Sequence, residues 1–352
     1  MSVRTETVIK VPNPQSLMDE FVHHIEEDHD AAFEVGPDGS RYLENVGFRV
    51  EFLPLPDGLK IAIKGPHQGM LVFVKDAVAQ HVGAFDAELA KSMRWSGEAE
   101  AEGELPANFR ILKVTAKSAP MSGLVRVTLH VPDSAFFAEA GIHLKMMLPA
   151  SAGRPPVWPR IGANGAPVWP QGDDALHARF MTIRHARPDA SEIDIDIAAH
   201  GDGLISNWAM NATEGQEIGA LGPIGNVEIP NADSYLLAAD LTGLPTIARF
   251  LEDATHSFAA QIVAEAASIE ALREYLPATD AGLHHLETKE FSNSVLETAK
   301  AHAADGVSYA YFAGEFQDAQ DLRKYFKATL GLGKGKQLSA PYWRRGTAGF
   351  EA

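Results

Sequence analysis

The sequence predicts a multidomain α+β protein, in which a small N-terminal α+β domain precedes an antiparallel β-barrel and a C-terminal α/β domain with a parallel sheet. The chain has 352 residues, whereas one typical domain has roughly 100 to 200. One break in composition and one change in hydrophobic period separate the parts, and a second break in composition lies within the middle part. We therefore expect domains at residues 1–100, 105–231 and 232–352.

The two breaks differ in character. Residues 97–108 (GEAEAEGELPAN) are acidic and nearly devoid of large apolar side chains, which is typical of a solvated linker. Residues 151–174 contain five prolines, too many for the interior of a long strand or helix. Trp158 and Trp169 in this second segment indicate an ordered loop that packs on a domain.

Residues 1–100 mix two periodicities. Apolar residues recur with helical spacing in two segments and alternate with polar residues in two others, which predicts an α+β module. The helical spacing is carried by Leu17, Phe21 and Ile25 and then by Leu71, Val74, Val78 and Val82; the alternation is carried by Val46, Phe48, Val50 and Phe52 and then by Ile61 and Ile63.

The pattern changes twice more along the chain. Short alternating runs at 125–131 and 193–197, separated by Gly and Pro, favour an antiparallel sandwich or barrel up to about Pro230. Beyond Pro230, buried strands alternate with helices, which implies a parallel α/β sheet. The expected strands are 235–239, 261–264 and 307–312, and the expected helices are 246–254, 294–304 and 318–330.

Composition excludes several classes of function. The chain has 30 Lys and Arg against 47 Asp and Glu, a formal charge of −17, so nucleic acid and anionic lipid are disfavoured as partners. It has no cysteine, which excludes disulfides, thiol nucleophiles and cysteine-ligated iron–sulfur clusters. Redox chemistry therefore requires a cofactor. Without a signal-like apolar N-terminus or a run of roughly 20 apolar residues, we expect a cytoplasmic protein with no membrane insertion.

The segment RFMTIR, residues 179–184, follows the proline-rich break and is expected to begin a strand. The guanidinium of Arg179 can hold a pyrophosphate, and the hydroxyl of Thr182 can hydrogen-bond a ring nitrogen. Strand alternation places Phe180, Thr182 and Arg184 on one face unless a bulge intervenes.

A second motif, HGDGLISNWA, occupies residues 200–209. Gly201 and Gly203 precede an expected helix start, so backbone N–H groups and a helix N-terminus can face a phosphate. Ser206 is the expected cap of this helix, and Trp208 follows it as a candidate core aromatic or cofactor contact.

Together these motifs resemble those of the siderophore-interacting protein family, FAD-dependent ferric-siderophore reductases among the ferredoxin-reductase-like flavoproteins. Members pair an Arg-x-Tyr-Thr-x-Arg strand with a His-Gly…Gly-x-x-Ser-x-Trp-Ala segment. Here Met181 stands where the aromatic that stacks on the flavin is usual. The segments ADLTGLP (239–245), AGE (313–315) and YWRRG (342–346) also resemble family motifs, so the likeness covers about residues 109–346. The first hundred residues resemble a small domain of unknown function that sometimes precedes such reductases.

The resemblance implies a Greek-key barrel that binds FAD, an NAD(P)-type α/β domain, and reduction of siderophore-bound iron(III) with NAD(P)H or ferredoxin as donor. It assigns no resident metal. No G-x-G-x-x-G fingerprint is present, which disfavours a standard Rossmann site. Thr182 is expected at the isoalloxazine edge, with Asp240 and Thr242 at the nicotinamide entrance. The expected cofactor-binding residues are Arg179, Phe180, Met181, Thr182, His200, Gly201, Gly203, Ser206, Trp208, Glu315 and Trp343.

Arg323, Lys324 and Lys327 form a local basic cluster in an acidic protein. One interpretation is that the cluster steers an anionic ferric siderophore toward the flavin, and the other is an ordinary solvated helix face. Two other functions stay open at this point. They are a flavin reductase with another acceptor and a non-catalytic flavin- or siderophore-binding protein.

Overall fold

The computed structural model describes residues 2–29, 32–45, 47–97, 101–149, 154–200, 203–225, 229–254 and 258–347. The chain forms two compact units, one made of Met1–Arg110, Leu148–Leu176 and Leu221–Gly225 and the other of Ile111–Met147, His177–Ala220 and Asn226–Ala352. The N-terminal module thus shares a unit with the proline-rich segment. Most of the barrel shares its unit with the C-terminal α/β domain.

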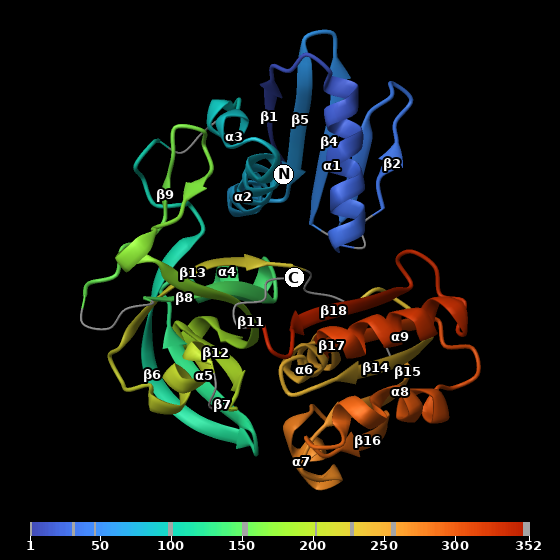
Figure 1. Ribbon diagram of the computed structural model, residues 1–352. Helices are drawn as coiled ribbons and strands as arrows, with labels where there is room; N and C mark the ends of the chain where they lie inside the picture. The colour runs from blue at the N-terminus through green and yellow to red at the C-terminus, as the bar shows by residue number, and fades with distance from the viewer. Residues whose placement is uncertain are drawn as a thin grey trace. The chain divides into compact units, whose positions relative to one another are not determined.

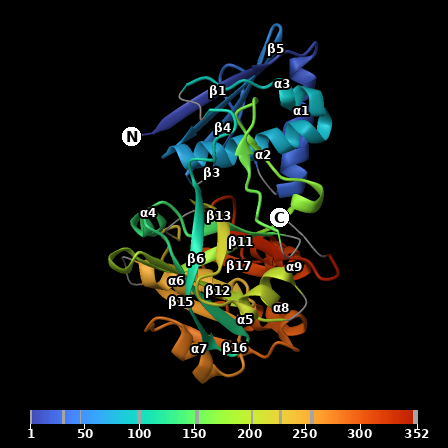
Figure 2. The ribbon, with the colours of Figure 1, turned by 90° about the vertical axis from the view of Figure 1, so that its left-hand side faces the viewer.

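The N-terminal module is an antiparallel sheet of order β1-β5-β4-β3-β2 with helices α1 and α2 on one face (Figures 1 and 2). Phe21 of α1 and Val74 of α2 enter the same core as Phe52 of the sheet, which confirms the expected α+β architecture. The elements are β1 (Val3–Ile9), α1 (Pro14–His29), β2 (Glu34–Val35), β3 (Arg41–Asn45), β4 (Phe48–Leu55), β5 (Gly58–Gly65), α2 (Gln68–Phe85) and α3 (Ala87–Ser92).

The proline-rich segment packs on this module. The indole Nε1 of Trp169 donates to both carboxylate oxygens of Asp76 in α2, at 3.2 and 3.3 Å. The side-chain amide of Asn164 donates to the Ala90 carbonyl of α3 at 3.2 Å. Despite its prolines the segment contains two short paired strands, β9 (Arg160–Ile161) and β10 (Pro167–Val168).

The acidic break is ordered over its second half. The backbone N–H of Gly103 donates to the Ile161 carbonyl, and the N–H of Ile161 donates to the Glu104 carbonyl, each at 2.8 Å. Asn108 is buried and donates its amide to the Gly69 carbonyl. The expectation of a wholly solvated linker is therefore wrong for residues 101–108, because backbone pairing does not need apolar side chains.

Limited proteolysis is expected to cut within residues 97–108, where Glu102 and Glu104 are exposed, without releasing the N-terminal module. The two fragments are expected to co-elute in gel filtration and to separate only in denaturant, because the proline-rich segment stays bound to α2. Asp76→Ala should ease the separation, whereas the exposed Asp57→Ala should not. Separation of the wild-type fragments without denaturant would contradict this packing.

The barrel closes in the order β11-β12-β7-β6-β13-β8. Strand β8 lies between β13 and β11 rather than beside β7, a Greek-key connection. Val127, Leu129, Ile193 and Ile195 are fully buried, so the alternation in β7 and β12 faces the interior as expected. The elements are β6 (Phe109–Met121), β7 (Leu124–His130), α4 (Ser134–Glu139), β8 (His143–Pro149), β11 (Leu176–Arg187), β12 (Glu192–Ala198), α5 (Leu204–Asn211) and β13 (Glu217–Ile224).

The C-terminal domain is a parallel sheet of order β16-β15-β14-β17-β18, which confirms the expected α/β architecture. Helices α6 and α7 pack on one face, and α8 and α9 pack on the other. The elements are β14 (Ser234–Ala239), α6 (Leu244–Asp253), β15 (Ala259–Glu265), α7 (Ile269–Tyr275), β16 (Gly282–Leu286), α8 (Phe291–His302), β17 (Tyr309–Glu315), α9 (Phe316–Ala328) and β18 (Gln337–Trp343).

The barrel and the α/β domain share a hydrophobic core. Met121, Leu124 and Ile142 of the barrel region are buried in the same cluster as Leu244 of α6 and Tyr275 of α7. Burying these side chains removes apolar surface of both domains from water, which favours one fixed arrangement of the barrel against the parallel sheet.

Candidate functional site

The parallel sheet changes its winding direction between β14 and β17, because β15 and β16 lie on one side of this pair and β18 lies on the other. In such sheets ligands bind beyond the carboxyl ends of the strands at this point. Asp240 directly follows β14, and Glu315 ends β17. A Cβ on Gly314 would lie only 2.6 Å from Asp240 Oδ2, so this close approach of the two strands requires glycine.

Three of the predicted site residues meet at Asp240. Its Oδ1 accepts hydrogen bonds from the Thr242 hydroxyl at 2.6 Å and from the Thr242 backbone N–H at 2.8 Å. Its Oδ2 accepts from the Trp343 indole at 2.7 Å. The carboxyl is thus engaged on both oxygens, and it fixes the turn after β14 and the Trp343 ring. A direct part for Asp240 or Thr242 in the chemistry stays a prediction.

The same carboxyl is unusually basic. Burial raises the pKa of Asp240 to about 6, although the hydrogen bonds from Thr242 and Trp343 lower it; the nearby charge of Glu265 raises it further. Desolvation penalises the charged form, while the donors stabilise it. Asp240 therefore titrates closer to neutrality than an ordinary aspartate.

Both carboxylate oxygens of Glu315 accept hydrogen bonds from backbone N–H groups. One carboxylate oxygen accepts from the backbone N–H groups of Gln317 and Asp318 and so caps α9. The other oxygen accepts from the Arg345 backbone N–H at 3.0 Å and holds the segment after β18. Its predicted contact with a cofactor stays a prediction.

The barrel brings the two sequence motifs to one end of a strand pair. Strands β11 and β12 are antiparallel, with Ile183 opposite Ile195. The start of β11, which carries Arg179 and Thr182, therefore lies beside the end of β12, where the chain continues toward α5. A bulge between Ile183 and His185 interrupts the strict alternation beyond this point.

The first residues of β11 differ in exposure. Phe180 is 39% exposed, and the Lys145 ammonium lies 5.0 Å from its ring centre. Arg179 and Met181 are half-buried. Thr182 is only 5% exposed, because α6 covers this part of the strand. Its hydroxyl lies 2.9 Å from that of Thr246 in α6.

Helix α5 begins after Gly203, and among the described residues no side chain caps it. Ser206 lies inside its first turn, and its hydroxyl accepts from the His200 backbone N–H at 3.0 Å. The expectation that Ser206 caps the helix is therefore wrong, because the helix starts two residues earlier. Gly201 lies outside the described residues. Trp208 Nε1 is buried and has no hydrogen-bond partner in the part of the chain that the structure describes.

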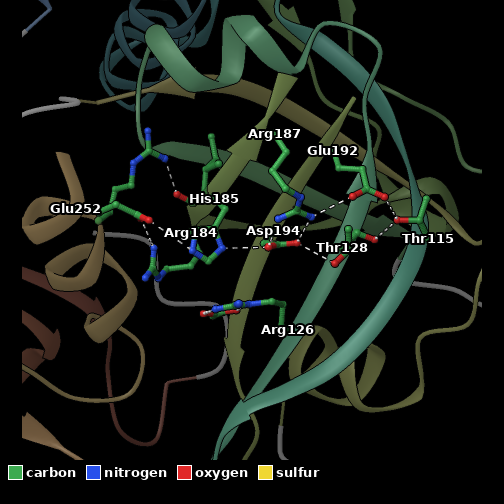
Figure 3. A network of polar contacts seen from close by, with 12 residues as sticks. Thr115, Arg126, Thr128, Arg184, His185, Arg187, Glu192, Asp194 and Glu252 are labelled. Atoms are coloured by element: carbon green, nitrogen blue, oxygen red, sulfur yellow. Dashed lines mark hydrogen bonds and ion pairs between the residues drawn. The ribbon is translucent and has the colours of Figure 1, made fainter. Parts of the chain in front are cut away.

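Arg184 belongs to a polar network that local patterns do not reveal (Figure 3). Its guanidinium donates to Glu252 of α6 at 2.5 Å. His185 Nε2 lies 3.9 Å from the same carboxylate, and His185 Nδ1 lies 3.0 Å from Asp194 in β12. Arg187 pairs with Asp194 from the other side. This network connects α6 to β11 and β12 of the barrel.

A second polar contact joins the domains. The Tyr275 hydroxyl of α7 donates to Asp196 of β12 at 2.7 Å, and Asp196 accepts two bonds from Arg126 at 2.7 and 2.8 Å. Arg249 of α6 donates to the Ile183 carbonyl at 3.0 Å. The charged residues beside the site thus hold the barrel and the parallel sheet together.

The basic cluster on α9 is divided. The guanidinium of Arg323 donates to the Ser339 carbonyl of β18 at 2.6 Å. Lys324 and Lys327 are exposed, and the Lys324 ammonium lies 3.9 Å from the Asp321 carboxylate. Lys324 and Lys327 are three positions apart and therefore lie on one side of the helix. The exposed positive charge of the cluster comes from these two lysines, because Arg323 is half-buried.

A closed barrel joined to a parallel α/β sheet is the ferredoxin-reductase-like fold. Residues 113–227 match the siderophore-interacting FAD-binding domain, and residues 232–346 match the siderophore-interacting protein domain. The chain belongs to the siderophore-interacting protein family. The first 112 residues lie before both matched regions.

Relatives of known name cover most of these two domains. Ferric vibriobactin reductase ViuB of Vibrio cholerae is 27% identical over 247 residues, which are 67% of this chain and 90% of that protein. The NADPH-dependent ferric-chelate reductase of Escherichia coli K12 is 29% identical over 151 residues, 41% of this chain and 56% of that protein. The crystal structure of the siderophore-interacting protein SipS from Aeromonas hydrophila has a TM-score of 0.57 at 28% identity and covers 68% of this chain and 93% of that one.

The residues present fit FAD. A dinucleotide flavin carries a pyrophosphate, which requires cationic or N–H donors, and a ring system with polar nitrogen and oxygen atoms. The Arg179 side chain and the first turn of α5 supply donors of that kind at one end of the barrel, and Thr182 supplies a hydroxyl beside them. The buried indole N–H of Trp208 is a further donor on α5.

Proposed function

We propose that this protein is a cytoplasmic FAD-dependent reductase of ferric siderophores that takes electrons from NADPH, NADH or ferredoxin. The observation that carries the proposal is the hydrogen bond between Thr182 and Thr246, which joins the flavin-domain strand to the helix that leaves the switch point of the parallel sheet. The relatives support it, since they include named ferric-chelate and ferric vibriobactin reductases. Among the described residues no helix has the length and apolar character needed to span a bilayer.

The reaction transfers two electrons from one nicotinamide to two iron ions. One NADPH and two ferric chelates give NADP⁺, one proton and two ferrous chelates. Bound FAD supplies a carrier that accepts two electrons as a hydride and passes them on singly. Iron(II) is softer and less charged than iron(III), so oxygen chelators release it more readily.

In this proposal the residues of the protein bind FAD and orient it. Arg179 and the first turn of α5, from Gly203 to Ser206, hold the pyrophosphate. Thr182 hydrogen-bonds the isoalloxazine edge, and the Met181 thioether packs beside it in place of an aromatic ring. Asp240 positions the Trp343 indole at the border of the nicotinamide site. No side chain needs to act as a nucleophile.

The function is tested by anaerobic turnover with a panel of ferric siderophores, each with NADH, NADPH or reduced ferredoxin. We expect ferrous iron to form, trapped by a ferrous chelator, at a rate that depends on the siderophore. Equal reduction of free flavins and unrelated acceptors would support a general flavin reductase instead. A preparation that binds FAD but reduces nothing would support a non-catalytic binding protein.

Neutralising Lys324 and Lys327 together is expected to lower kcat/KM for an anionic ferric siderophore about five-fold at low salt, because each lysine contributes about 0.5 kcal/mol toward a unit charge at 8 Å in water. The loss should shrink at high ionic strength. A neutral ferric trihydroxamate should be unaffected.

The matched control is the double variant Lys91→Gln/Lys113→Gln, which removes two exposed lysines from α3 and β6. Equal losses for charged and neutral substrates would indicate a folding defect. No loss for either substrate would mean that Lys324 and Lys327 belong to an ordinary solvated helix face.

A further inference from the structure

A chain of hydroxyl groups runs from the parallel sheet to the barrel. The hydroxyls of Tyr311 in β17 and Tyr342 in β18 lie 3.3 Å apart. Tyr342 lies 3.2 Å from the Thr246 hydroxyl, which lies 2.9 Å from that of Thr182. At the barrel end, His143 Nδ1 of β8 lies 3.4 Å from the Thr182 oxygen.

Every group in this row of hydroxyls, and His143 at its end, is neutral near pH 7. Burial, together with the positive charge of Arg249, lowers the pKa of His143 to about 4, although a hydrogen bond with the Met181 backbone opposes this. Burial raises the pKa of Tyr311 well above 10 and also raises the pKa of Tyr342. The groups therefore act through the direction of their hydrogen bonds rather than through charge.

A hydroxyl donates one hydrogen and accepts up to two. If Tyr311 donates to Tyr342, Tyr342 to Thr246 and Thr246 to Thr182, the Thr182 hydrogen is the one that remains to be placed. It has two alternatives, which are an acceptor outside this row of hydroxyl groups or Nδ1 of His143 in the tautomer that carries its hydrogen on Nε2. One short rotation of the Thr182 hydroxyl exchanges them, and no proton leaves its oxygen.

We propose that His143 is a positioning residue that lets Thr182 reverse its hydrogen-bond direction between the two oxidation states of the flavin. This inference rests on the proposed function, in which Thr182 faces the isoalloxazine edge. An oxidised ring nitrogen is an acceptor, so Thr182 donates to it. A reduced ring N–H is a donor, so Thr182 accepts from it and donates its own hydrogen to His143 Nδ1.

The test is the midpoint potential of bound FAD in His143→Leu and His143→Phe, measured by spectroelectrochemistry on the full chain. Without Nδ1 the Thr182 hydrogen can turn away from the reduced N–H only toward Thr246 Oγ1, which requires Thr246 and Tyr342 to reverse their own hydrogen bonds. We expect the potential to become more negative, with affinity for reduced FAD falling about five-fold relative to oxidised FAD, the equivalent of one neutral hydrogen bond of about 1 kcal/mol.

His143→Gln is expected to restore the wild-type potential, since its amide oxygen can accept the hydrogen and its NH₂ can donate. Thr246→Val is the comparison variant: it removes the hydroxyl on the other side of Thr182 but keeps the His143 acceptor, so it should shift the potential less than His143→Leu does. Using both Leu and Phe guards against one variant failing to fold.

Wild-type potentials in both His143→Leu and His143→Phe overturn the inference while leaving the proposed function intact. Shifts of the potential in His143→Gln and Thr246→Val as large as the shift in His143→Leu also overturn it, because a general loss of packing would then explain the change. Failure of the wild type to bind FAD overturns both the inference and the proposed function.

Discussion

Replacing Asp196 with Ala is expected to lower the free energy of unfolding by about 3 to 5 kcal/mol, the range for removing one partner of a buried ion pair. The Asp196 side chain is fully buried, accepts two bonds from Arg126 and accepts the Tyr275 hydroxyl. Its loss leaves a partly buried guanidinium and a buried phenol without their acceptor. Urea unfolding followed by circular dichroism measures the change.

Two variants bracket this result. Asp196→Asn keeps an acceptor for Tyr275 but removes the charge, so it should lie between wild type and Asp196→Ala. Glu88→Ala removes an exposed partner of Lys91 and should leave stability unchanged, because solvent screens that pair. A loss for Asp196→Ala no larger than that for Glu88→Ala would mean that this contact does not hold the barrel against α7.

Arg179→Ala is expected to raise the Kd for FAD by about ten- to hundred-fold, since a charge-assisted hydrogen bond contributes about 1.5 to 3 kcal/mol. Thr182→Ala should raise it only about five-fold, the value of about 1 kcal/mol for a neutral bond, and should instead alter the potential or the rate. Titration of the apoprotein with FAD, followed by flavin fluorescence, measures both constants.

Arg273→Ala is the control for a general loss of positive charge, because Arg273 is exposed on α7. It should bind FAD like the wild type. Equal affinities for Arg179→Ala and the wild type would remove Arg179 from the cofactor site, and the first turn of α5 would then be left as the proposed pyrophosphate contact.

Elements with a strict apolar period are predictable from the sequence, and elements without one are not. Strand β12 is found through Ile193, Ile195 and Ile197, because alternate side chains fill the barrel interior. Strand β1 gives no such signal, since Thr5 and Thr7 occupy two of its buried positions. Strand β18 lies at the sheet edge, where only Ser339 is buried, so no apolar alternation marks it.

The candidate site divides in the same way. Arg179, Thr182, Asp240 and Trp343 are recognisable because each lies in a short motif whose residue types suit phosphate, flavin or nicotinamide chemistry. His143 and Glu252 lie in no motif quoted from the sequence. They stand out only in the structure, where His143 contacts Thr182 and Glu252 contacts Arg184.

By itself the sequence determined the order of domains, the family motifs and the absence of thiol chemistry, because these follow from composition and from neighbours within a few residues. Only the tertiary structure decided which motif residues meet. Thr182 and Thr246 are 64 residues apart in the chain, Arg184 and Glu252 are 68 apart, and Asp196 and Tyr275 are 79 apart. Such contacts depend on how the barrel closes and how the parallel sheet packs against it, and no local period of the sequence encodes that packing.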